Sequence, residues 1–84
     1  MKRYSTTDFD KLNLQQRQQL VFKTGNYVTK RRKLHYIFAL YTVGKEFFEV
    51  RYNDLKHTIE QIEKPKDKQL FIYTKEVYLE GLSL

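Results

Sequence analysis

The segment from Leu34 to Asn53 constrains the fold more than any other part of this chain. It is a run of apolar and aromatic residues, LHYIFALYTV, that reaches Gly44-Lys45 and continues as EFFEVRYN. A glycine in the first position of a two-residue loop suits a type II′ turn, because that position needs a positive φ. The segment is therefore predicted to form an antiparallel β-hairpin.

The turn also predicts the register of the two strands and divides the hairpin into two faces. Side chains alternate with period two on each strand, and the turn sets Val43 opposite Glu46. The predicted core face pairs Tyr41 with Phe48, Ala39 with Val50 and Ile37 with Tyr52. The other face is amphipathic, with Tyr36, Phe38, Leu40 and Thr42 opposite Asn53, Arg51, Glu49 and Phe47. A slip of one residue would set charges against apolar residues, which disfavours other registers.

The residues before the hairpin are typical of a helix. Asn13 can accept hydrogen bonds from the amides that follow it, and Gln16 stands at the third helical position. Gly25 comes directly after the last plausible turn. We predict a helix from Leu14 to Thr24, with its glutamine-rich side facing solvent.

Residues 1–12 show no sustained hydrophobic period and are predicted to be a mobile N-terminal segment. Phe9 and Leu12 are the residues within it that are able to pack onto the rest of the chain. Residues 13–84 are predicted to form a single α+β domain, because no linker or internal repeat interrupts them.

A strand is predicted from Asn26 to Lys30, where β-forming residues follow the helix. The basic run Lys30, Arg31, Arg32 and Lys33 comes next, directly before Leu34. It contains no Gly, Asn or Pro, so two alternatives remain for it. It is either a type I turn with a bulge or a loop between the two strands.

Two alternatives also remain between Asn53 and Pro65. Leu55, Ile59 and Ile62 have helical spacing, which slightly favours a helix, whereas residues 57–63 could instead form a fourth strand after a turn. Pro65 ends either element. A C-terminal helix is predicted from a cap at Asp67 to Leu79, with an apolar stripe of Leu70, Tyr73 and Val77 and a stop at Gly81.

Several of these features also resemble those of a group of small bacterial proteins of unknown function. The shared features are Gly25 after the helix, Leu40-Tyr41, Phe47-Phe48-Glu49-Val50 with Tyr52-Asn53, Ile59-Glu60 with Ile62, and a C-terminus with leucine and tyrosine. The resemblance covers residues 14–84. It implies a helix, a four-stranded antiparallel meander and a second helix, and so favours a strand after Asn53. It implies no catalytic residue and no known activity.

The composition argues against an enzyme, a metal centre or a membrane protein. The 84 residues include no cysteine, which fits a reducing compartment, and only two histidines, His35 and His57, with no third ligand at a recognisable spacing. Glu49, Glu60 and Glu63 could approach one another across strands, but exposed strand positions explain them as well. No apolar stretch is long enough to span a bilayer. We therefore expect a cytoplasmic protein with no cofactor, small-molecule ligand, metal or catalytic site.

The basic run suggests one possible ligand. The formal net charge is +6, and Lys30 to Lys33 contribute four of the positive charges. Four cations beside Tyr27, Tyr36 and Phe38 could contact phosphates while the aromatic rings stack on unpaired bases. Weak nucleic-acid binding through this run is one functional hypothesis.

The amphipathic hairpin face suggests a different partner. If both helices cover the core face, then Tyr36, Phe38, Leu40 and Phe47 keep only partial cover. An exposed apolar patch of this kind commonly marks a protein partner or a homodimer. One helix on each face would instead close the patch. Protein interaction or self-association through one sheet face is the leading hypothesis.

Overall fold

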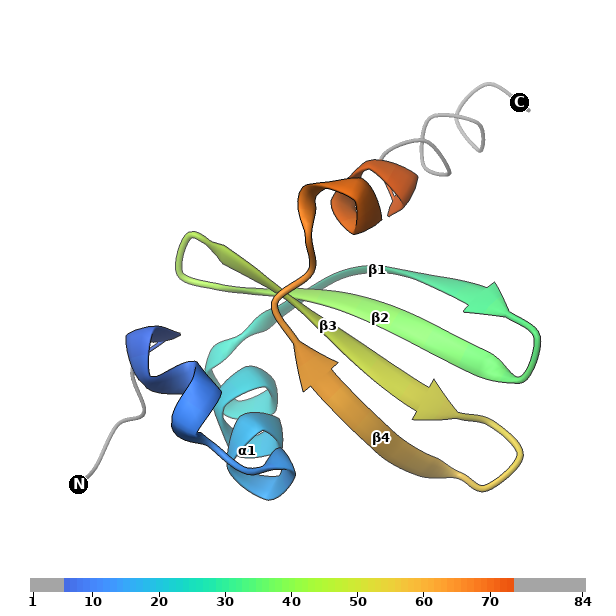
Figure 1. Cartoon of the computed structure of the whole chain (residues 1–84), viewed down its shortest axis with the longest axis horizontal. Helices are drawn as coiled ribbons and strands as arrows, with labels where there is room; N and C mark the ends of the chain where they lie inside the picture. Colours follow the sequence, from blue (N-terminus) through green and yellow to red (C-terminus); the bar gives the residue numbers. More distant parts are fainter. Residues whose placement is uncertain (1–5, 74–84) are drawn as a thin grey trace.

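The structure is a computed structural model that describes residues 6–73, with side chains described from residue 9 onward. Its elements are, in order, the 3₁₀-helix η1 (Thr6–Lys11), the helix α1 (Leu14–Thr24) and the strands β1 (Asn26–Lys33), β2 (Tyr36–Val43), β3 (Glu46–Asn53) and β4 (Thr58–Glu63). A further helix begins at residue 67 and is described as far as residue 73. The α+β class is confirmed (Figure 1).

The four strands form one antiparallel meander in the order β1-β2-β3-β4. The hairpin of β2 and β3 has the predicted register, from Val43 opposite Glu46 to Tyr36 opposite Asn53. Gly44 has a φ of 61°, so the first turn position is the left-handed one that glycine was expected to fill.

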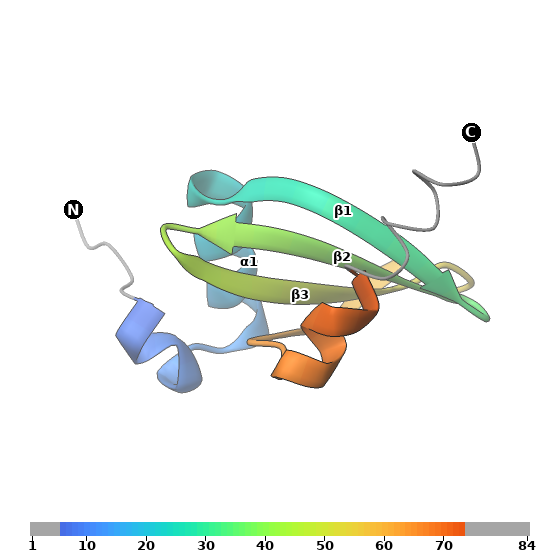
Figure 2. The ribbon, with the colours of Figure 1, turned by 90° about the horizontal axis from the view of Figure 1, so that it is seen from above.

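One helix lies on each face of the sheet (Figure 2). We call the face under α1 the α1 face and the face under residues 67–73 the opposite face. In the middle of β3, Phe48 and Val50 are buried on the α1 face, while Glu49 between them is buried on the opposite face. Consecutive burial of three alternating side chains requires cover on both sides.

The hydrophobic core lies between α1, η1 and the α1 face. Phe9, Val21, Phe48 and Ile62 are its largest fully buried side chains, and the rings of Phe9 and Phe48 lie 4.8 Å apart. Burial of a side chain of this size stabilises the fold by about 2 kcal/mol. Phe9 and Leu12, the two residues of the N-terminal segment that were expected to be able to pack onto the rest of the chain, are both buried in this core, and Phe9 anchors η1 to it. Residues 1–5 lie outside the described residues.

Helix α1 has the predicted bounds and the predicted cap. The Asn13 side chain accepts a hydrogen bond from the Gln16 amide, and the Gln16 side chain accepts one from the Asn13 amide, both at 2.9 Å. Gly25 has an ordinary φ of −94°, so its requirement is space rather than backbone freedom. A Cβ there would collide with the Val21 carbonyl oxygen and would lie 3.1 Å from that of Thr42.

The predicted position of the first hairpin turn is wrong. Lys30 to Lys33 are strand residues of β1, and the turn consists of Leu34 and His35. Leu34 occupies the left-handed position with a φ of 57°. Leucine is rarely found in turns, so the sequence did not predict a turn at this position.

Residues 58–63 are a strand, so the helical alternative for this segment is wrong. The Asn53 side chain accepts hydrogen bonds from the Leu55 and Lys56 amides and shapes the turn before β4. The ladder then shifts by one residue, so that Ile59 pairs with Tyr52 and Ile62 with Val50. A β-bulge therefore produced the spacing of three that resembled a helix.

The C-terminal helix begins one residue earlier than predicted, because Asp67, the expected cap, is its first helical residue. Its first turn is capped from Lys66, whose carbonyl accepts from the Gln69 amide and whose own amide donates to the Gln69 side chain. Tyr73 of the predicted stripe is buried, and Leu70 is half-buried. Val77 and Gly81 lie outside the described residues. No helix in residues 6–73 is long and apolar enough to cross a membrane.

Candidate functional site

The four aromatic and aliphatic residues predicted to form an interface do lie on one face, but they do not form an open patch. Leu40 is only 4% exposed and Phe47 is 39% exposed, while Tyr36 and Phe38 are half-buried. The C-terminal helix lies over the middle of this face (Figure 2). The alternative of one helix on each face is the one that the structure adopts.

A buried polar cluster lies beneath the C-terminal helix. The Tyr73 hydroxyl donates a hydrogen bond to Glu49 at 2.7 Å, and the Arg31 guanidinium lies 4.0 Å from the same carboxylate. Burial and the neighbouring Glu49 carboxylate raise the pKa of Tyr73 far above its usual value near 10. These contacts dock the helix and keep the Tyr73 hydroxyl protonated.

The three carboxylates that could have formed an acid–base site have structural partners. Glu49 and Glu63 stand directly opposite each other, and the Gln69 amide nitrogen lies 3.5 Å from both. Glu60 accepts a hydrogen bond from Asn53 at 3.1 Å. A polar pocket of about 140 Å³ lies beside them, lined by Phe38, Glu49, Arg51, Gln61, Glu63 and Gln69. Within the described residues, no group of three acidic, histidine or cysteine side chains could hold a metal ion.

The strand conformation of β1 separates the four predicted nucleic-acid-binding cations. Lys30 and Arg32 pair with Ala39 and Ile37 on the α1 face, whereas Arg31 and Lys33 project from the opposite face. A basic run that looks continuous in the sequence therefore places only two cations on each face.

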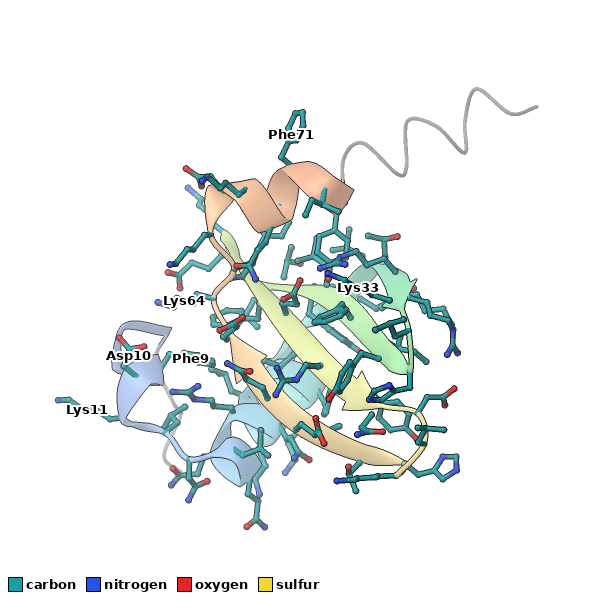
Figure 3. The ribbon with its side chains drawn as sticks, turned by 45° about the vertical axis from the view of Figure 1, so that its right-hand side comes forward. Phe9, Asp10, Lys11, Lys33, Lys64 and Phe71 are labelled. Atoms are coloured by element: carbon teal, nitrogen blue, oxygen red, sulfur yellow. The ribbon has the colours of Figure 1, made fainter. Side chains whose placement is uncertain are left out.

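The four cations also differ in their surroundings. Arg31 is 12% exposed and lies over the rings of Phe38 and Tyr73, with its central carbon 4.4 and 5.4 Å from their centroids. Arg32 is more than half exposed and pairs with Asp54 at 3.1 Å. Lys30 and Lys33 are exposed (Figure 3 shows Lys33). Arg31 is a structural residue, and the other three remain accessible to a ligand.

The α1 face is covered at one end only. Helix α1 lies near the turn between β2 and β3, and the far end of the sheet extends beyond it (Figures 1 and 2). An 11-residue helix is about 16 Å long and 10 Å wide, whereas eight-residue strands are about 27 Å long. One helix of this size cannot cover the whole face.

The uncovered end holds half-buried apolar side chains beside two cations. We define the open surface as Lys30, Arg32, Ile37, Tyr52 and Ile59, which share the α1 face by their register. A shallow pocket of about 120 Å³ lies at its border, lined by Lys30, Arg31, Arg32 and Ile37. No sequence motif predicts this surface. The only signal in the sequence is that the predicted helix is shorter than the strands on which it packs.

Exposed aromatic residues continue the α1 face beside the C-terminal end of α1. The rings of Phe22 and Tyr27 both pack edge-on against Tyr41, with centroids 5.4 and 5.7 Å away. Phe22 is 42% exposed and Tyr27 is 54% exposed. These rings supply further apolar area on the side of the sheet that carries the open surface.

The two edges of the sheet are β1 and β4. At β4, the Arg17 guanidinium donates a hydrogen bond to the Ile62 carbonyl at 2.8 Å, and helix α1 packs nearby. At β1, no described side chain hydrogen-bonds to the backbone of Lys30 to Lys33. Among residues 6–73, the edge of β1 therefore has the less protected backbone.

Comparisons with known proteins add no further constraint. No family model matches the chain, and the searches of curated proteins and of solved structures found no match either. The resemblance to small bacterial proteins stays a prediction.

Proposed function

We propose that this chain is a non-enzymatic protein-interaction module that binds its partner through the open surface. The observation that carries the proposal is the incomplete cover of the α1 face, where Ile37 and Tyr52 stay half-buried beyond the end of α1, next to Ile59 at the border of the core. Ile37 and Tyr52 lie outside the core cluster. A partner that covered them would remove apolar area from water without a rearrangement of the fold.

The charges around the open surface indicate the chemistry of the partner. Lys30 and Arg32 border it, whereas the β4 carboxylates Glu60 and Glu63 lie on the opposite face with Glu49. Asp54 is the acidic residue that pairs with Arg32. A partner with apolar side chains and acidic residues beside them would complement this arrangement. Aromatic and arginine side chains are also the types that carry most of the binding energy at protein interfaces.

The titratable side chains of the described residues support a non-enzymatic role. Glu49 and Glu63 belong to the contacts of the C-terminal helix, the His57 ring lies 3.2 Å from the Tyr52 hydroxyl, and the His35 ring packs at a tilt against that of Tyr36. We also propose a cytoplasmic location, which the cysteine-free composition supports.

A pair of crosslinking variants tests the proposal in cells. A photoreactive amino acid at Ile37 reports on the open surface, and one at Phe71, which is 66% exposed and points away from the sheet, is the matched control (Figure 3). We expect a protein that crosslinks at position 37 and not at position 71. The captured protein, once purified, should shift the amide resonances of the open surface, and Ile37→Asp should abolish those shifts while Phe71→Asp should not.

Two results would overturn the proposal. One is a captured protein that shifts only residues of the opposite face. The other is a short single-stranded oligonucleotide that shifts the open surface at low salt while purified captured proteins do not, which would favour nucleic-acid binding instead. Self-association through the open surface would appear as a sedimentation mass that rises with concentration and is lost in Ile37→Asp, and it would support the proposal with a second copy as the partner.

A further inference from the structure

The edge of β1 offers backbone groups that no side chain of the described residues occupies. Lys33 and Tyr36 close a two-residue turn, and residues in that position exchange both ladder hydrogen bonds. Because ladder bonds alternate along an antiparallel strand, Arg31 also bonds to β2, while Lys30 and Arg32 turn their N–H and C=O groups outward. The ladder is regular from Thr29 to Lys33, since the bulge lies before it, between Tyr27 and Thr29.

We propose that β1 accepts an extended, acidic segment of a protein partner as a fifth strand of the sheet. This inference rests on the proposed function and adds the binding mode and the chemistry of the segment. Lys30 and Arg32 supply the backbone donors and acceptors at the edge, and their side chains lie on the α1 face beside the open surface. An added strand would therefore continue the open surface directly.

The charge pattern predicts which positions of the segment are acidic. Residues of the segment opposite Lys30 and Arg32 project onto the α1 face, where two cations meet them. A residue opposite Lys33 meets an exposed cation on the opposite face. A residue opposite Arg31 meets a cation that Glu49 and Tyr73 already surround. The segment should carry glutamate or aspartate opposite Lys30, Arg32 and Lys33, and a neutral residue opposite Arg31.

The same charges argue against a second copy of the chain at this edge. Antiparallel pairing of two β1 edges would set the run from Lys30 to Lys33 against itself, and like charges directly opposite each other are destabilising. The β4 edge of a second copy is acidic, but its Ile62 carbonyl is already bonded to Arg17. The occupant that remains is an acidic segment of a different protein.

A peptide titration tests the binding mode. The probe is an eight-residue peptide in which glutamate alternates with valine or threonine, so that glutamates stand opposite Lys30 and Arg32 and the residue opposite Lys33 is neutral. Its two controls carry N-methyl groups either on the glutamate amides or on the intervening amides. Methylation removes the donors of one edge and leaves the charge unchanged. In a strand on β1, the glutamate amides face Lys30 and Arg32, so methylation there should weaken binding at least about tenfold. Methylation of the other amides should leave binding unchanged.

Amide hydrogen exchange supplies the second readout. Binding should slow exchange at Lys30 and Arg32 by about tenfold or more, because their amides become ladder donors. The double variant Lys30→Gln/Arg32→Gln should weaken binding about tenfold, whereas Lys23→Gln/Lys45→Gln, which removes two exposed cations elsewhere, should not.

Three results would overturn the strand-addition proposal. Both methylated peptides could bind as well as the parent, which would show that charge attraction alone, without backbone hydrogen bonds, holds the peptide. An oligothymidylate of eight nucleotides could protect the same two amides equally well. The peptide could also fail to bind, which would leave the cations as a device against edge aggregation. In each case the crosslinking at Ile37 still tests the proposed function separately, because that variant does not depend on the β1 backbone.

Discussion

The two edges of this sheet are protected in different ways. The β4 edge is six residues long, carries a bulge, and has its Ile62 carbonyl bonded to Arg17. The β1 edge is eight residues long and carries four consecutive cations, and no side chain within the described residues hydrogen-bonds to their backbone. At the first edge a side chain already occupies a backbone acceptor, whereas at the second edge charge repels only strands of the same sign. An edge protected by charge alone can still accept an acidic strand.

Arg17 performs several of the contacts that close the β4 side. Its guanidinium also donates to the Leu12 carbonyl at 3.0 Å and lies 4.2 Å from the centroid of the Phe9 ring. One side chain therefore joins η1, α1 and the edge of β4. The β1 edge has no equivalent residue among those described.

The largest predicted effect concerns this closed edge. Arg17→Met keeps an apolar stem but removes both hydrogen bonds and the contact of the cation with Phe9, so the free energy of unfolding should fall by about 3 kcal/mol. Urea unfolding measures it, with Gln19→Met on the exposed side of α1 as the control. A loss no larger than that of the control would show that Arg17 does not hold this side together.

The next effect separates the structural cation of β1 from an exposed one. Arg31→Gln leaves the buried Glu49 without its cation and should lower the free energy of unfolding by about 2 kcal/mol. Lys33→Gln, on the same face and strand, should change it by less than about 0.5 kcal/mol. Equal losses in urea unfolding would mean that the run acts as one uniform charged surface.

Alkaline pH tests the anchor on which Arg31 packs. Because the pKa of Tyr73 is raised in the folded protein, the unfolded chain loses that proton near pH 10 while the folded chain keeps it. The contribution of Tyr73 to the free energy of unfolding is therefore at its maximum well below pH 10. It falls as the pH rises, and about 1.4 kcal/mol of it is lost at pH 11. The decline between pH 9 and pH 11, followed by urea unfolding, should be smaller by that amount in Tyr73→Phe. Parallel declines would contradict a protonated, buried Tyr73.

The smallest effect is at the turn that positions the β1 edge. Leu34 is 80% exposed and has a φ of 57°, a conformation that is costly for leucine and that asparagine tolerates better. Leu34→Asn should therefore raise the free energy of unfolding by about 1 kcal/mol. Leu55→Asn is the control, because Leu55 is also an exposed turn residue but has no positive φ. A stabilisation shared by both variants would point to lost surface hydrophobicity rather than relieved backbone strain.

Local chemistry made much of the fold predictable from the sequence. Gly44 and the alternation of apolar residues around it predicted the register of β2 and β3. The capping residues Asn13 and Gln16 predicted the start of α1. The predictions of the first turn and of the segment after Asn53 were wrong because the residue types there are not typical of the structure that they adopt. Leu34 adopts a turn conformation without being a turn residue, and the bulge in β4 gave Ile59 and Ile62 a helical spacing.

The candidate site was less predictable, because it depends on where the helices lie. The sequence indicated an amphipathic sheet face, but only the tertiary structure shows that the C-terminal helix covers it, with Tyr73 on Glu49. The open surface exists because α1 is shorter than the strands. The residue patterns predicted both lengths, but not where along the sheet the helix lies. The division of the basic run between two faces became visible only once β1 was found to extend to Lys33.

The most direct test of the open β1 edge is a set of intermolecular NOEs in the complex with the alternating glutamate peptide. In an antiparallel pair, residues that are not hydrogen-bonded to each other bring their α protons closest together. A fifth strand on β1 predicts NOEs from the α protons of Arg31 and Lys33 to α protons of the peptide. NOEs confined to side chains, or to the opposite face around Phe38 and Gln69, would contradict strand addition at this edge.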